Sequence, residues 1–310
     1  MSVPLAFVPL LHVGASLSWT SFTVHWSTVV GLACLAGLYE WRARKGGIGN
    51  GNGRVGRSDS QSHDAQTSPE SAHSHSDFPF RRRVFYAGLA AMFFSLNGWL
   101  HDLSDYYLFS AHMVQHLLLT MLVPPLLIAG TPGWMLRPML RWRAIARVAG
   151  ALTRPKVCFA TFNLVLAAWH LPPLYNTAMA HHEIHILQHL MFLAASVMFW
   201  WPILSPMPEL PRLSYPMQML YLFLTSIPMS IIAVCIIYGG TLLYPAYAAA
   251  PRIAGLGPLD DQLLGGLIMW IPGGLVLFAV ISVIFFQWQA HGAEDSVASA
   301  QVDWRPAAGA

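Results

Sequence analysis

The sequence predicts an all-α polytopic membrane protein with seven transmembrane helices, from its composition, the length of its apolar runs and the placement of its basic residues. Of the 310 residues, 55% are hydrophobic and only 10% are charged, whereas about a quarter of a soluble domain is charged. The apolar runs extend over about 15 to 24 residues, enough for a helix to cross a hydrocarbon core of about 30 Å. So few charges exclude a water-soluble fold of this size.

The seven helices are placed by reading the apolar runs between charged or Pro/Gly-rich breaks. The first run lacks the basic region of a secretory signal and continues into a full span, so we expect it to be retained. The fourth run is the shortest, and Lys156 at its inner end can snorkel to let it span. The expected helices are residues 19–41, 84–103, 108–129, 155–171, 184–204, 217–238 and 263–286.

Basic residues concentrate in two of the expected loops and predict the orientation. Eight lie between the first and second helices and six between the third and fourth. Because cytoplasmic loops carry the excess of Lys and Arg, both loops are expected inside, which leaves only Arg252 outside. The N-terminus is therefore predicted to be external and the C-terminus cytoplasmic. The basic residues are a topology signal and do not indicate nucleic-acid binding.

The chain divides into four expected regions. Residues 1–45 form the external N-terminus and the first helix, and residues 46–80 form a cytoplasmic loop that is predicted to be disordered because it has almost no large apolar residues. Residues 81–290 form a six-helix bundle, and residues 291–310 form a cytoplasmic tail. Within the bundle, HMVQHLL at 112–118 matches HILQHLM at 185–191, which suggests a parallel repeat of helices two and three with helices four and five.

Histidines gather in the outer halves of the expected spans. Residues four apart share a helix face, so each of two pairs, His112 with His116 and His185 with His189, presents two imidazoles in one direction. A single buried histidine is more simply explained by hydrogen bonding between helices, but several at one depth favour a metal or cofactor site. The candidate ligands are His25, His101, His112, His116, His170, His185 and His189, with Asp261, Gln115 and Gln188 as partners that would orient them.

Copper is the preferred cofactor, with haem as the alternative. Imidazoles suit several transition metals, and thioethers favour Cu(I); Met113, Met179 and Met191 lie near the histidines. Histidines on facing helices can instead hold a haem. The three cysteines are far apart and form no CxxC motif. We find no phosphate-binding loop, serine-hydrolase elbow or HExxH motif, so we do not expect an enzyme.

Three ordered motifs resemble the CtaG family of cytochrome c oxidase assembly factors, associated with caa-type oxidases. They are HMVQHLL at 112–118, followed by PPLL at 124–127 and GTP at 130–132; HILQH at 185–189, followed by FWWP at 199–202; and DQLLGGLIMWIP at 261–272. The resemblance covers about residues 99–286. The family's characteristic histidines fall on His112, His116, His185 and His189, and its DQ pair on Asp261 and Gln262.

The resemblance implies a seven-helix protein of the bacterial inner membrane that is needed to assemble a haem–copper oxidase, with a link to copper delivery. The implied partners are oxidase subunits, membrane lipid and a periplasmic copper carrier, with no nucleic acid. Two other functions stay open: a haem-binding electron-transfer subunit, and a structural accessory subunit of a respiratory complex.

Overall fold

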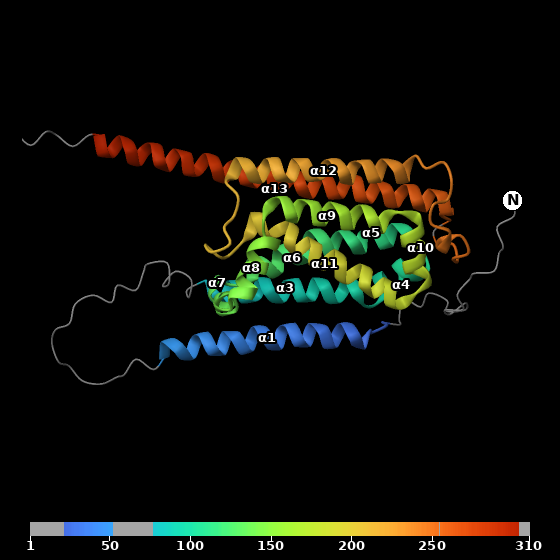
Figure 1. Ribbon diagram of the computed structural model, residues 1–310. Coiled ribbons are helices and arrows are strands. Elements are labelled where there is room, and N and C mark those ends of the chain that lie inside the picture. Colours follow the sequence, from blue (N-terminus) through green and yellow to red (C-terminus); the bar gives the residue numbers. More distant parts are fainter. Residues whose placement is uncertain (1–21, 52–76, 254, 304–310) are drawn as a thin grey trace, which may run out of the picture.

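The structure is a computed structural model that describes residues 22–51, 77–253 and 255–303, and all regular elements within these ranges are helices. The longer helices run along a common direction (Figure 1). These are α1 (Trp26–Gly51), α3 (Phe78–Leu96), the continuous segment α5 (Phe109–Leu117), η1 (Leu118–Leu122) and α6 (Val123–Gly130), then α9 (Pro155–His170), α11 (His182–Leu204), α12 (Tyr215–Ile237) and α13 (Pro258–Asp303).

Among the residues that the structure describes, four segments are long and apolar enough to cross a membrane: α5 to α6, α11, α12 and α13 up to Gly292. A fifth is added if α9 and the short helix α10 (Pro172–Ala180), which are bent by 72° relative to each other, form one span. The predicted all-α membrane class is therefore confirmed. The expected number of seven spans and the orientation of the termini stay predictions.

One expected helix, residues 84–103, is broken in two. Helix α3 ends at Leu96 and the short helix α4 (Trp99–Tyr106) starts a new direction. Gly98 between them has φ +70°, a backbone conformation that residues other than glycine rarely adopt. The residues at this break hold the segment that leads into α1. Gly98 N–H donates to the Thr23 carbonyl, and His25 N–H donates to the Asn97 side chain.

Other boundaries also differ from the expected ones. Helix α13 begins at Pro258 and continues to Asp303, past the expected end at 286 and into the expected tail. The expected disordered loop, 46–80, falls mostly on positions 52–76, outside the described residues, and α1 and α3 include its two ends. Of the first expected helix, residues 19–21 also lie outside the described residues, and α1 itself starts at Trp26.

The helices pack through small residues and two clusters of buried apolar side chains. Helix α3 packs on α6, α12 on α13, α5 on α13, and α9 on α11. Gly130 lets α6 approach α3 closely, because a Cβ atom there would overlap the Phe85 backbone. Helices α4 and α10 lie at one end of the bundle, and α7 (Gly133–Leu136) and the arginine-bearing helix α8 (Arg143–Leu152) lie at the other (Figure 1). The histidines described next lie near the α4 and α10 end.

Candidate metal centre

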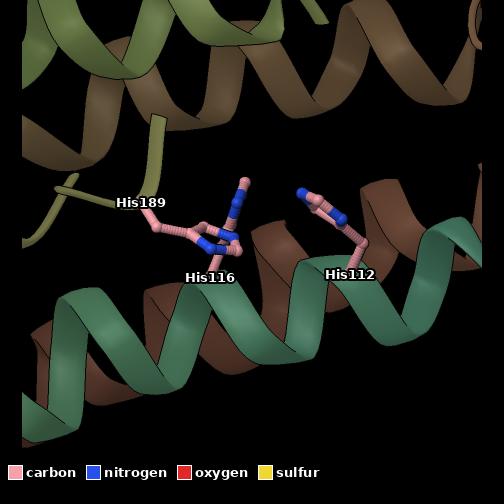
Figure 2. Close-up of side chains that lie close together, drawn as sticks. All are labelled: His112, His116 and His189. Carbon is pink, nitrogen blue, oxygen red and sulfur yellow. The ribbon is translucent and has the colours of Figure 1, made fainter. Parts of the chain in front are cut away.

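Three predicted ligands form the centre of the site, which we call the three-histidine cluster: His112 and His116 on α5, and His189 on α11. One ring nitrogen of each lies within 4.8 Å of one from each of the others. The ring centroids of His112 and His116 are 4.2 Å apart, as their spacing of one helical turn predicts. Figure 2 shows the rings extending from two helices into one shared space.

Several ring nitrogens of the cluster are unpaired within the part of the chain that the structure describes. Both nitrogens of His112 and of His116, and Nε2 of His189, are buried with no hydrogen-bond partner among the described residues. Leaving a buried polar atom unpaired costs about 1–3 kcal/mol, so several together need an explanation. Neutral imidazole is a good ligand for copper, zinc, iron and nickel, and an ion bound between these nitrogens would satisfy them.

A second group of ligand atoms overlaps the first through His112. It adds His185 of α11 and Asp105 of α4, and the ligand atoms of all three lie within 4.8 Å of one another. Asp105 Oδ2 is 3.5 Å from His185 Nδ1 and 3.4 Å from His101 Nε2. The Asp105 carboxylate thus lies between two predicted ligands, His101 and His185, and adds a hard oxygen donor beside their imidazoles. Sequence reasoning missed Asp105, although it lies one helical turn after His101.

His101 is held by the predicted orienting residue Gln115. The Gln115 amide nitrogen lies 3.0 Å from His101 Nδ1 and donates to the Ser95 carbonyl, while its oxygen accepts from the Ser104 hydroxyl. The predicted ligand His25 stacks edge-on against His101 with ring centroids 4.3 Å apart. Both histidines therefore lie at the edge of the site, outside the three-histidine cluster.

His170 lies at the opposite edge, near His116. Their ring centroids are 6.2 Å apart, and Nδ1 of His170 is 2.7 Å from the Leu166 carbonyl. Since a carbonyl only accepts, Nδ1 carries the hydrogen and Nε2 of the neutral ring is left as the ligand atom. Gln188, the other predicted orienting residue, is fully buried on α11 with no partner for its amide among the described residues.

The loop between α12 and α13 closes the site with two tyrosines that sequence reasoning missed. Tyr244 donates to the His170 carbonyl at 2.9 Å, and Tyr247 donates to the Ser104 carbonyl at 2.7 Å. The Tyr175 hydroxyl of α10 lies 2.9 Å from that of Tyr247. Burial raises the pKa of both loop tyrosines, so each hydroxyl keeps its proton and remains a donor.

The DQ pair at the start of α13 fixes backbone near the site, and within the described part of the chain its hydrogen bonds go to main-chain groups and not to a histidine. Asp261 accepts from the backbone N–H groups of Phe109 at 2.6 Å and Ser110 at 3.1 Å. These N–H groups begin α5, where a helix has donors without internal partners and favours negative charge. Asp261 therefore positions the helix that carries His112 and His116. Gln262 accepts from Leu243 N–H and holds the tyrosine loop.

An open groove gives access to one side of the site. It has a volume of about 430 Å³ and lies between α1, α3 and α11. Its wall is mostly apolar, but His101, His185 and His189 border it, together with His25 and His182. The imidazoles on α11 thus face both the buried cluster and a space that opens to the outside of the bundle.

Comparison with known proteins identifies a family and several relatives. Residues 70–291 match the family described as cytochrome c oxidase caa3 assembly factor (Caa3_CtaG). Uncharacterized proteins of Mycobacterium bovis and Mycobacterium tuberculosis are each 25% identical over 221 residues, which is 66% of this chain and 33% of theirs. One of Mycobacterium leprae is 25% identical over 197 residues, 58% of this chain and 30% of its own.

The chain therefore spans about a third of the length of these relatives. No solved structure matches it significantly. The family match covers the region that contains α3 to α12 and α13 as far as His291, including all the candidate ligands except His25. This chain belongs to the family of cytochrome c oxidase caa3 assembly factors.

Proposed function

We propose that the protein binds copper at the three-histidine cluster and delivers it to a haem–copper oxidase during assembly. The observation that carries the proposal is the set of buried ring nitrogens on His112, His116 and His189 that have no partner among the described residues. They lie close enough together to bind one ion. Assembly of a copper enzyme needs a protein that can hold and release copper, which a site of imidazoles in a membrane bundle can do.

The surroundings of the cluster support a carrier role. Asp105, His185 and His101 lead from the cluster to the groove, so copper entering there meets a series of donors at short spacing. We infer that the donor is a periplasmic copper carrier and the recipient an oxidase subunit, both acting at the outer face of the bacterial inner membrane. Under this proposal the protein is not an enzyme, because copper is its cargo.

The test is copper content in protein purified in detergent. We expect copper in the parent and its loss in His112→Ala/His116→Ala, because these side chains are two of the three ligands in the cluster. The matched control is His181→Ala/His291→Ala, which removes two exposed histidines. Copper is measured by elemental analysis, and oxidase assembly by haem spectra of the membranes.

Each outcome decides between the functions considered. Copper that is present in the parent and the control, and absent from the cluster variant, supports delivery. A Soret band in the purified parent supports the haem-binding alternative. A colourless, copper-free parent, combined with normal oxidase assembly in the cluster variant, overturns copper delivery and favours a structural role.

A further inference from the structure

A second, smaller cavity borders the three-histidine cluster at His116. Its volume is about 30 Å³, room for one or two small species, since a water needs about 10–15 Å³ on this measure. Two imidazoles border it, those of His116 and His170. The wall also contains four buried methionines from different segments: Met113 of α5, Met121 of η1, Met229 of α12 and Met269 of α13. We call this space the methionine cavity.

The ligand atoms around the methionine cavity are soft. A thioether is a poor ligand for Zn²⁺ and a good one for Cu(I), while imidazole binds both. Both ring nitrogens of His116 are without partners within the described ranges, so this ring is available to an ion. Thr120, the remaining polar residue of the wall, already donates its hydroxyl hydrogen to the His116 carbonyl. Four thioethers and two imidazoles around so small a space form a donor set suited to Cu(I).

The backbone beside the methionines is less tightly bonded than in an ordinary helix. Met229 directly follows Pro228, and Met269 lies three residues before Pro272. Proline has no N–H, so each helix lacks one internal hydrogen bond near the cavity. Gly273 adds room, because a Cβ atom there would lie 3.4 Å from the Met229 sulfur. The flexible thioether side chains can therefore adjust around an ion.

We propose that the methionine cavity is a Cu(I) site, and that His116 connects it to the three-histidine cluster. The proposal rests on the proposed function and deepens it by naming the oxidation state of the cargo. Moving Cu(I) from imidazoles to thioethers exchanges one set of ligands for another and leaves the oxidation state unchanged, so no reductant is needed. His116 is the shared ligand that borders both spaces.

The test uses the full chain, purified in detergent without oxygen and titrated with Cu(I) against a chromophoric chelator. X-ray absorption at the copper edge then separates sulfur from nitrogen neighbours. The variant is Met229→Leu/Met269→Leu, because leucine keeps nearly the same volume but has no sulfur. The control is Met135→Leu, a buried methionine of α7 in a different part of the core. Zn²⁺ binding reports on the three-histidine cluster in each protein.

We expect sulfur neighbours in the parent and the control. In the double variant we expect fewer sulfur neighbours, because only Met113 and Met121 remain, a Cu(I) affinity about tenfold weaker and unchanged Zn²⁺ binding. Copper with only nitrogen neighbours in the parent overturns the methionine site and leaves the proposed function standing. So does an unchanged number of sulfur neighbours in the double variant, since Met229 and Met269 would then not be ligands. A parent that binds no copper overturns both. If the double variant melts below the control, Met269→Leu alone is the test.

Discussion

Trp200 donates its indole N–H to the backbone carbonyl of Thr120 at 2.9 Å. In a helix this carbonyl would accept from the residue four or five positions later, but these are Pro124 and Pro125, which have no N–H. The π-helical turn that contains Thr120 begins two residues after His116 of α5. A side chain of α11 thus supplies the hydrogen bond that the main chain of this turn cannot make.

We predict that Trp200→Phe destabilises the protein by about 1–3 kcal/mol, because the buried Thr120 carbonyl loses its donor. Thermal unfolding in detergent measures the loss. The control is Trp201→Phe, since the Trp201 indole has no partner among the residues described. Equal melting temperatures for the two variants would show that the hydrogen bond contributes nothing.

Asp261→Ala is expected to loosen the start of α5. It leaves the buried N–H groups of Phe109 and Ser110 without an acceptor. Each unpaired group lowers the free energy of unfolding by about 1–3 kcal/mol. Asp261→Asn retains one acceptor oxygen and should lose less. Both are compared by thermal unfolding and copper content with Asp260→Asn, which changes an exposed neighbour. Unchanged copper binding in the alanine variant would contradict a positioning role.

Asp105→Asn tests the carboxylate between His101 and His185. We predict a copper affinity about 10–100-fold weaker, the usual effect of losing a charged partner of metal-ligating histidines, with little change in stability. Isothermal titration of the metal-free protein measures it. Asp102→Asn is the control because Asp102 lies on the same helix and accepts from Thr23 at the surface. The prediction is wrong if the two variants bind copper equally.

Tyr247→Phe should lower the melting temperature and weaken the packing of the loop over the site. The variant removes the donor to the buried Ser104 carbonyl, which corresponds to about 1–3 kcal/mol. Hydrogen exchange of residues 239–257 measures the loop directly. Tyr238→Phe is the control, because that side chain is 78% exposed. Exchange that is equally slow in both variants would show that the loop does not depend on this bond.

The sequence predicted the helical class and the pairing of His112 with His116, because the spacing of residues along one helix is fixed by helix geometry. It could not show that His189, rather than the neighbouring His185, completes the three-histidine cluster, since that depends on how α11 packs beside α5. Asp105 was missed because it fell in an expected loop. The break at Gly98 instead makes residues 99–106 a separate helix with His101 and Asp105 on one face.

Tyr244 and Tyr247 were missed for a different reason. Their loop has no periodic pattern, and contacts with α4, α9, α10 and α13 give it a defined position. The orienting role expected for Asp261 depends in the same way on long-range structure, since its partners lie 152 and 151 positions earlier in the chain.

Because Asp261 follows Phe109 and Ser110 by about 150 positions, the start of α5 receives its acceptor late in synthesis. Helix α5 leaves the ribosome long before α13, and until α13 arrives the first amides of α5 lack the carboxylate that receives them. The same late segment brings Gln262, which holds the tyrosine loop over the histidines. The start of α5 and the tyrosine loop are thus completed only after α13 has been synthesised, so a chain truncated before α13 would lack both of these contacts.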